Sequence, residues 1–400
     1  MIHRFAKIGF MNTGKYIFSQ IILHLPARVF DRCVDHYDGN KYVKHFTCWS
    51  QLLCMMFGQL SGRDSLRDLL VSISPHKAKF YHLGFGKNVS KTNLALANEK
   101  RDYRIFEEFA YVMIKKARSC SMPDADFKLD IAGSVYAFDS TLIDLCLNVF
   151  WWAEFRTTKA AIKMHTLIDV KTSIPCFVHI TDGATHDVHG LDVLKYETGG
   201  FYVLDRGYVD FERLFKINRC GAYFVTRAKD NLNFARITSR KVKKKKGVLC
   251  DQTINLKGFY SSDKYPDNLR RIRFIDKETE KRFVFITNNF DLAPEDVALL
   301  YKYRWKIELF FKWIKQHLKI KSFWGTTENA VRIQIYSAII TYTLIVVIKN
   351  KLKLLQSNYE ILQILSISLL DKETLKGLLS NSVNQNVKEQ SYDQLKFDLF

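Results

Sequence analysis

A basic stretch in the last third of the chain contains a single acid. Residues 301–319 read YKYRWKIELFFKWIKQHLK, with Glu308 among six Lys and Arg residues. On one continuous helix of about 100° per residue, Tyr301, Arg304, Glu308 and Lys315 fall within roughly 60° of one another. One interpretation is a solvated face with an Arg304–Glu308 ion pair, worth about 0.2–0.5 kcal/mol. The other is a row of functional side chains.

Two aspartates favour the functional interpretation, because each ends a predicted apolar strand. Asp139 lies in SVYAFDST, residues 134–141, and Asp205 lies in FYVLDRGY, residues 201–208. Carboxylates at strand ends of an open α/β sheet point into the crevice where ligands bind. Together with Glu308 they would form an oxygen cage suited to Mg²⁺. Two such ions about 3.5–4 Å apart can activate a water or a 3′-hydroxyl and stabilise the leaving oxygen.

The other side chains of the helical row suit a nucleic-acid backbone. Arg304 can bind a phosphate through its planar fork, and Lys315 can act as a point charge. Tyr301 can hydrogen-bond a phosphate, and Trp305 offers a ring face to an unstacked base. We therefore expect these four residues to contact DNA.

These residues resemble the DDE transposases of bacterial insertion sequences, specifically the insertion-sequence-four family. That family carries a Tyr-two-Arg-three-Glu-six-Lys signature, and Tyr301, Arg304, Glu308 and Lys315 have this spacing. The segments AFDSTLIDLCL and FYVLDRGYVDF are similar to those around its two aspartates. FTCWSQLLCMMFGQLSGRDSLRDL resembles the helical segment that precedes the catalytic core, so the likeness covers nearly the whole chain.

The resemblance implies a catalytic and metal-binding triad of Asp139, Asp205 and Glu308, with two Mg²⁺ or Mn²⁺ ions as cofactor. It also implies binding to terminal inverted repeats, cleavage that exposes a 3′-hydroxyl, joining of that end to target DNA, and a homodimer in the synaptic complex. Excision through a hairpin, as in some members, is a hypothesis here.

The elements that must position these residues divide the chain into five parts. Residues 1–125 read as a helical, DNA-binding domain, with apolar residues at helical spacing over 49–62 and a clear amphipathic helix at 102–118. Residues 126–228 begin a ribonuclease H-like core, 229–290 form a β-rich insertion, and 291–350 return to the core. Residues 351–400 read as a helical region suited to dimerisation.

Within the core, the predicted order is three strands, a helix, a strand, a helix and a strand. A hairpin turns at residues 171–173, and helices are expected at 188–197 and 210–220. A long helix is expected from Pro294, because proline and acids suit a helix start. This α/β order is that of the ribonuclease H-like fold.

Composition bounds the partners. The net charge of the 400 residues is +20, which points to a polyanion, with nucleic acid ahead of an anionic membrane surface. The longest clean apolar run, residues 338–348, is shorter than a bilayer span, and we read no export signal. Eight cysteines without a CxxC pair argue against zinc and for reduced thiols. We expect a cytoplasmic, nucleoid-associated protein of bacterial origin.

Several features stay open. His179, His186 and His189 lie close in sequence, with Asp187 either beside a metal or as a helix-capping acid. Arg206 either contacts DNA or pairs with an acid. Seven of the residues 236–246 are Lys or Arg, in a predicted loop that is either solvated or contacts phosphate.

Further alternatives concern the N-terminal region and the function itself. Arg63 and Arg67 either bind the terminal repeats or pair with Asp64 or Asp68. Asp144 is expected beyond the end of its strand, in a structural role. Two other functions are a nuclease that uses the same acids without strand transfer, and an inactive transposase-derived DNA-binding protein.

Overall fold

The structure is a computed structural model that describes residues 14–381 apart from 87–88, 157–158, 243, 319 and 321. The chain forms two compact units. Among the described residues, the helical unit comprises 14–122, 143–160 and 312–381, and the sheet unit comprises 123–142 and 161–311.

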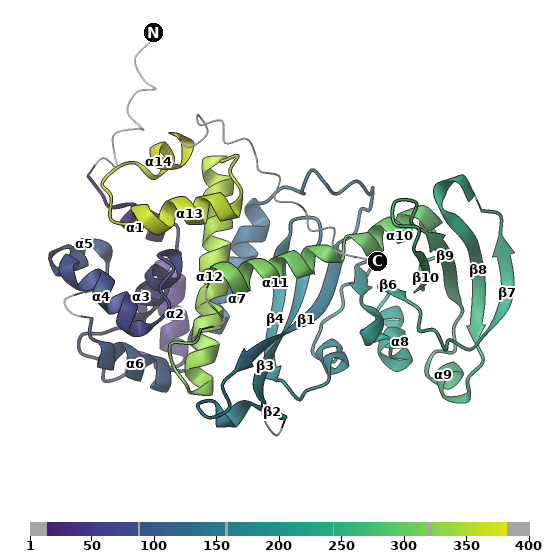
Figure 1. The fold of residues 1–400 in the computed structure, drawn as a ribbon, viewed down its shortest axis with the longest axis horizontal. Helices are drawn as coiled ribbons and strands as arrows, with labels where there is room; N and C mark the ends of the chain where they lie inside the picture. Colours follow the sequence, from purple (N-terminus) through teal and green to yellow (C-terminus); the bar gives the residue numbers. More distant parts are fainter. Residues whose placement is uncertain are drawn as a thin grey trace, which may run out of the picture. The chain divides into compact units, whose positions relative to one another are not determined.

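The helical unit contains most of the helices (Figure 1). Its N-terminal elements are α1 (Ile17–Ile22), α2 (Ala27–His36), α3 (Cys48–Leu60), α4 (Leu66–Ile73), η1 (Ser74–Lys79), α5 (Phe80–Leu83), α6 (Lys91–Lys100) and α7 (Arg104–Cys120). Its later elements are η2 (Trp151–Ala153), β2 (Glu154–Arg156), α12 (Glu328–Leu352), α13 (Asn358–Ser368) and α14 (Leu375–Asn381). Ser90 caps α6, because its side chain accepts a hydrogen bond from the backbone N–H of Asn93.

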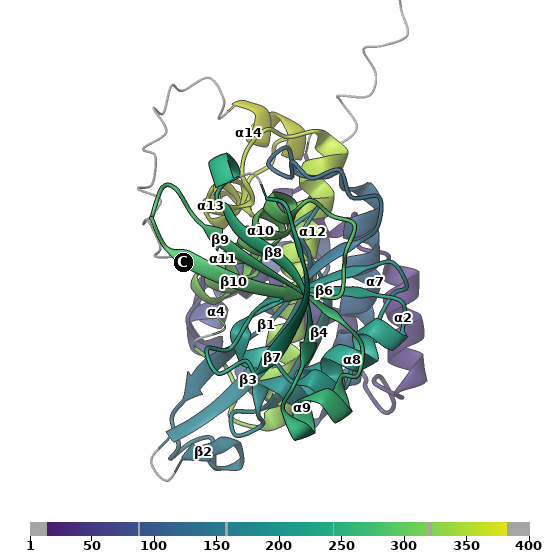
Figure 2. The ribbon, with the colours of Figure 1, turned by 90° about the vertical axis from the view of Figure 1, so that its right-hand side faces the viewer.

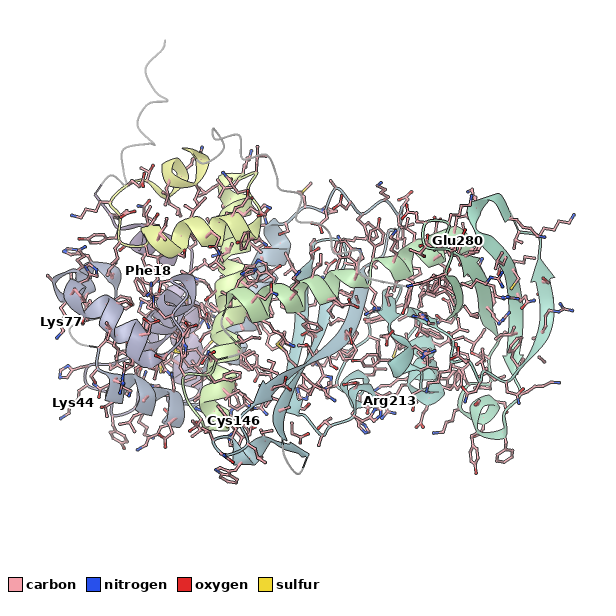
Figure 3. The ribbon with its side chains drawn as sticks, in the orientation of Figure 1. Phe18, Lys44, Lys77, Cys146, Arg213 and Glu280 are labelled. Carbon is pink, nitrogen blue, oxygen red and sulfur yellow. The ribbon has the colours of Figure 1, made fainter. Side chains whose placement is uncertain are left out.

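The core of this unit is built around α12, which packs against α3 and α7. Aromatic side chains fill the space near α1, where Phe18 contacts Phe57 and Phe85. Phe18 is labelled in Figure 3. By length and composition α12 is apolar enough to cross a membrane, but 94% of its most apolar window is buried inside the protein. That is the position of a core helix. The uninterrupted apolar run at 338–348 is therefore shorter than the apolar helix of which it forms a part.

The sheet unit is built from strands and the helices beside them. Its strands are β1 (Val135–Leu145), β3 (Lys159–Asp169), β4 (Ile174–Asp182), β5 (Phe201–Leu204), β6 (Tyr223–Arg227), β7 (Phe234–Arg240), β8 (Val248–Leu256), β9 (Leu269–Ile275) and β10 (Arg282–Thr287). Its helices are η3 (Asp187–Leu191), η4 (Arg206–Tyr208), α8 (Phe211–Arg219), η5 (Lys244–Lys246), α9 (Phe259–Lys264), α10 (Pro294–Lys302) and α11 (Trp305–His317). The ends of β1 and α11 and the start of β3 fall in the helical unit.

The described strands form one ten-stranded sheet in the order β2-β3-β1-β5-β6-β10-β9-β8-β7, with β4 also paired to β3. The strands β1, β5 and β6 run parallel, and β10, β9, β8 and β7 continue antiparallel. Figure 2 shows these strands fanning about a common centre, which is the usual twist of a sheet. The strands from β7 to β10 thus extend the same sheet, because β10 pairs directly with β6.

The structure corrects three sequence expectations. The predicted helix at 188–197 is only the short 3₁₀ helix η3, which lies close against β3: a Cβ on Gly190 would lie 2.7 Å from His165 Nδ1. The predicted basic loop begins as the edge strand β7, where charged side chains discourage pairing with another chain. The strand β1 continues to Leu145, so Asp144 is an exposed strand residue.

Candidate active site

The register of two parallel strands places Asp139 beside Asp205. Residues 135–138 of β1 pair one to one with residues 201–204 of β5, and the last pair is Phe138 with Leu204. The next residue on each strand is an aspartate. Asp139 therefore lies within β1 and not at its end, but it follows the last residue of β1 that pairs with β5. Both carboxylates reach the same edge of the sheet.

A break in the predicted long helix brings the third acid to this edge. The sequence predicted one continuous helix, but α10 ends at Lys302 and α11 begins at Trp305. The connection is a tight turn, in which the Arg304 N–H donates to the Tyr301 carbonyl at 3.0 Å. Tyr301 and Glu308 therefore belong to different helices, and Arg304 lies at the corner between them.

Arg304 connects two of the acids directly. Its Nη1 lies 3.2 Å from Asp139 Oδ2, and its Nη2 lies 2.6 Å from Glu308 Oε1. The Tyr301 hydroxyl donates to Asp205 Oδ1 at 3.3 Å. All three acids thus meet the corner between α10 and α11. The Arg304 side chain is only 13% exposed, whereas that of Glu308 is 41% exposed and can meet a ligand from solvent.

Burial and neighbouring charge shift the protonation of this group. Burial raises the pKa of Asp139 to about 6, against the opposing effects of the Arg304 charge and the Ser140 N–H. The carboxylates of Asp205 and Glu308 add to the rise, because a nearby negative charge disfavours the ionised form of Asp139. A cation placed among them would relieve this repulsion.

The second aspartate has the opposite shift. Burial acts to raise the pKa of Asp205, but the N–H groups of Arg206 and Gly207, the Arg304 charge and the Tyr301 hydroxyl outweigh it and lower the pKa. The site therefore holds one carboxylate that ionises readily and one whose charge is disfavoured. For Arg304, burial lowers the pKa, but Tyr301 and then the three carboxylates outweigh burial and raise it.

The donor set fits a hard divalent cation, although the side chains as they stand do not form a closed metal cage. Within the described part of the chain, no group of three or more His, Cys, Asp or Glu side chains is placed to hold a metal ion. The Arg304 guanidinium contacts both Asp139 and Glu308 and supplies the positive charge between these two carboxylates. Three carboxylates around one cation are nevertheless the oxygen ligands that Mg²⁺ and Mn²⁺ prefer.

The structure places the remaining predicted contact residues in different surroundings. Trp305 begins α11 and is half-buried. Lys315 is half-buried further along α11, in the part of the helix that falls in the helical unit. Arg206 is exposed and pairs with Asp230 at 3.0 Å, as expected if it pairs with an acid. In the helical unit, Arg63 pairs with Asp68 at 3.6 Å.

Four polar residues near Asp139 were not predicted as part of this site. The Tyr208 hydroxyl donates to Asp139 Oδ1 at 3.5 Å, and Ser140 donates to Asp187, which pairs with Lys163. Lys163 gives a readable signal, since it lies between two apolar residues, Ile162 and Met164, and all three are buried. Asp187 does not cap η3, because its carboxylate accepts from Ser140.

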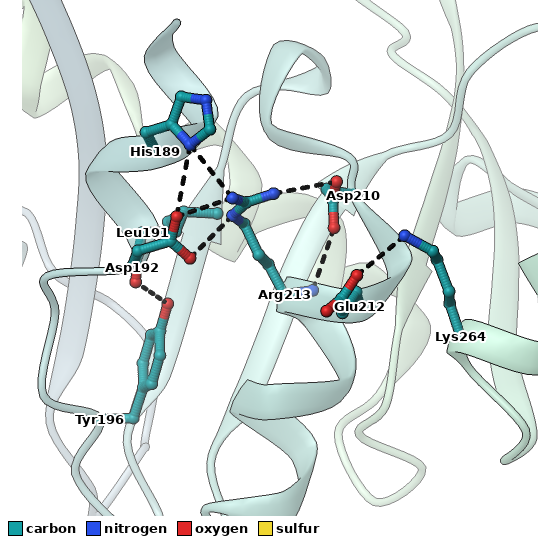
Figure 4. A network of polar contacts seen from close by, with 8 residues as sticks. All are labelled: His189, Leu191, Asp192, Tyr196, Asp210, Glu212, Arg213 and Lys264. Carbon is teal, nitrogen blue, oxygen red and sulfur yellow. Dashed lines mark hydrogen bonds and ion pairs between the residues drawn. The ribbon is translucent and has the colours of Figure 1, made fainter. Parts of the chain in front are cut away.

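His189, one of the three histidines that lie close in sequence, belongs to a different network of polar contacts, which Figure 4 shows from close by. Arg213 on α8 contacts His189 Nδ1 at 3.2 Å, Asp192 Oδ2 at 2.7 Å and Asp210 Oδ2 at 3.1 Å. His189 also lies 3.4 Å from Asp192. These contacts tie η3 to the start of α8 and use His189 as a structural partner.

Two segments of the chain match known protein families. Residues 131–344 match the family described as transposase DDE domain, and residues 13–86 match a domain of unknown function, DUF4372. A putative transposase, y4zB, of Sinorhizobium fredii is 32% identical over 256 residues, which cover 63% of this chain and 69% of the relative.

Two further relatives are also named as transposases. A probable transposase for insertion sequence element IS5377 of Geobacillus stearothermophilus is 33% identical over 52% of this chain and 54% of the relative. A putative transposase for insertion sequence element IS4SA of Synechocystis is 28% identical over 65% of this chain and 72% of the relative.

Proposed function

Because the chain belongs to the DDE transposases, we propose that it moves an insertion sequence by cleaving DNA at the element's terminal inverted repeats and joining the 3′-hydroxyl ends to target DNA. In this proposal Asp139, Asp205 and Glu308 are the catalytic carboxylates. The observation that carries it is their approach to the α10–α11 corner from β1, β5 and α11. Relatives named as transposases of insertion sequences support the same reaction.

The order of elements supports a ribonuclease H-like core. Three strands (β1, β3 and β4) precede β5, α8 and β6, and the parallel strands β1, β5 and β6 lie side by side. The helix expected between the third and fourth strands is reduced to η3. The spacing of Tyr301, Arg304, Glu308 and Lys315 favours the insertion-sequence-four family and the reaction of its members.

The carboxylates of Asp139, Asp205 and Glu308 would hold two Mg²⁺ or Mn²⁺ ions. When bound, such ions polarise the scissile phosphate and lower the pKa of an attacking water. The protein's own contribution is to orient the carboxylates. Arg304 and Tyr301 position the acids through the contacts described above, and with Trp305, Lys315 and Arg206 they would also bind DNA near the cleaved bond.

The remaining assignments follow from the same family membership. We place end recognition in residues 1–125 and a homodimer contact in residues 351–400, of which 1–13 and 382–400 lie outside the described residues. The strands from β7 to β10 would give the DNA a second, basic surface. A bacterial cytoplasm with access to the nucleoid is the compartment that this reaction needs.

The experiment combines the protein with Mg²⁺, DNA bearing the element's own ends, and a target plasmid. Strand transfer is the expected product. Asp139→Asn, Asp205→Asn and Glu308→Gln should each lower cleavage by roughly 10³-fold or more while end binding, measured by gel shift, stays close to that of the wild type. Cleavage without transfer would indicate a nuclease, and binding without cleavage would indicate an inactive DNA-binding protein. Retained cleavage in the three variants would contradict the assignment of the acids.

A further inference from the structure

A chain of polar side chains leads away from Asp139 into the sheet unit. The Ser140 hydroxyl donates to Asp187 Oδ1 at 2.7 Å, and Lys163 Nζ lies 2.8 Å from the same oxygen. Lys163 also donates to the Thr185 carbonyl at 2.5 Å. These contacts tie β1 to β3 and to the segment that follows β4. We call Ser140, Asp187 and Lys163 the polar chain.

Lys163 is the fixed end of the polar chain. Its side chain is only 9% exposed, and a buried ammonium group requires an anion and further acceptors to offset its lost hydration. Asp187 supplies the anion and Thr185 supplies a carbonyl. Because Lys163 projects from a strand inside the sheet, it fixes the Asp187 carboxylate to which Ser140 donates.

The other end of the polar chain reaches the carboxylate of Asp139. The Ser140 N–H donates to Asp139 Oδ1 at 2.8 Å, and the buried Tyr208 hydroxyl approaches the same oxygen at 3.5 Å. Arg304 contacts the other oxygen, Oδ2. The orientation of the carboxylate therefore depends on the Ser140 peptide group, and the Ser140 side chain is anchored to Asp187.

We propose that Lys163 and Asp187 are positioning residues, which act through Ser140 to hold the Asp139 carboxylate in the orientation that binds a divalent cation. This inference rests on the proposed role of Asp139 as a metal ligand. Hydrogen bonds behind a ligand restrict its orientation, and loss of such partners typically costs about 10–100-fold in metal affinity. A pair that served stability alone would leave metal affinity unchanged in the protein that remains folded.

The test measures Mn²⁺ binding to the full chain without DNA, from the loss of the free-ion signal in electron paramagnetic resonance. Asp187→Asn and Ser140→Ala are each expected to weaken Mn²⁺ binding by about 10-fold. Ser140→Thr keeps the hydroxyl and should bind Mn²⁺ within about 2-fold of the wild type, well inside the change expected for a lost partner. Asp251→Asn is the control, because it breaks another buried ion pair, with Arg270 on β9, four strands along the sheet from β1.

The outcomes separate this inference from the proposed function. Weakened binding in Asp187→Asn and Ser140→Ala, but not in Ser140→Thr or Asp251→Asn, supports the positioning role. Unchanged affinity in both of the first two variants overturns it while leaving the metal site intact. Equal weakening in Asp251→Asn also overturns it, as a general effect of lost stability. If Asp205→Asn binds Mn²⁺ as tightly as the wild type, the metal site itself is wrong and the inference fails with it.

Discussion

Two of the arginines that pair with aspartates in the sheet unit, Arg270 and Arg304, differ in how completely they are paired. Arg270 on β9 binds Asp251 through Nε at 2.9 Å and Nη2 at 2.8 Å, and its Nη1 donates to the Leu292 carbonyl at 2.6 Å. Both side chains are almost fully buried, at 3% and 4% exposure. Arg240 also contacts Asp251 Oδ1, at 3.2 Å, so arginines use both carboxylate oxygens of Asp251.

Arg304 is paired in a more open way. It makes one contact to Asp139 and one to Glu308, and its Nε has no hydrogen-bond partner among the described residues. Glu308 remains partly exposed, and the pKa of Asp139 stays raised despite the arginine. Stable folding favours a pair in which every atom is satisfied. A site that must accept a ligand keeps acids whose charge is only partly compensated.

The Arg270–Asp251 pair and the Arg304–Asp139 pair should differ most in their contribution to the free energy of unfolding. Asp251→Asn removes the anion from a buried pair and leaves Arg270 with uncompensated charge, so we expect the free energy of unfolding to fall by about 3–5 kcal/mol. Asp139→Asn removes a carboxylate whose ionisation is disfavoured, so at pH 7 the free energy of unfolding should stay level or rise. Urea unfolding of both variants measures this contrast. Equal losses would show that the two pairs serve the same structural purpose.

The pH dependence of unfolding sharpens the comparison. The pKa of Asp139 is raised from 3.8 to about 6 in the folded protein, so the folded state binds this proton more tightly than the unfolded state. Between about pH 4 and pH 6 the contribution of Asp139 to the free energy of unfolding should therefore fall as pH rises, by no more than about 3 kcal/mol. Asp139→Asn removes this contribution, so its stability relative to the wild type should increase over that range.

The measurement is urea unfolding of both proteins at several pH values in the presence of a metal chelator. Asp251→Asn provides the control, since it leaves Asp139 in place and should show the wild-type slope over the same range. A wild-type advantage over Asp139→Asn that grew with pH would contradict the raised pKa of Asp139.

The two aspartates of the site could be predicted because the relevant signal is local. Each follows a run of apolar residues, and a strand that changes from buried to polar side chains marks the edge of a sheet. The parallel register of β1 and β5 then brings Asp139 and Asp205 side by side. The sequence placed Glu308 at the same site only through its spacing from Arg304 and Tyr301.

The break between α10 and α11 could not be predicted, because residues 301–305 contain no proline or glycine. Contacts from a distant segment hold it: the Tyr303 hydroxyl donates to the Asp126 carbonyl at 2.7 Å and accepts from the Lys128 N–H at 2.9 Å. Lys306 is also buried, against Asp124 at 2.6 Å. Such long-range partners carry no periodic signal, and the same is true of the pairing between Lys163 and Asp187.

The smallest expected effects come from two buried tyrosines, one in each region. The Tyr301 hydroxyl donates to Asp205, whereas the Tyr265 hydroxyl, in the core beside β8 and β9, has no partner among the described residues. Tyr301→Phe removes the hydrogen bond that orients Asp205. The activation free energy of cleavage should rise by about 1 kcal/mol, which corresponds to roughly 5-fold slower cleavage. Tyr265→Phe removes an unpaired buried hydroxyl, so its free energy of unfolding should stay level or rise by about 1 kcal/mol. Cleavage rates and urea unfolding of both variants test this contrast. If cleavage slows in Tyr265→Phe, or keeps the wild-type rate in Tyr301→Phe, the hydrogen bond to Asp205 does not distinguish the site from the core.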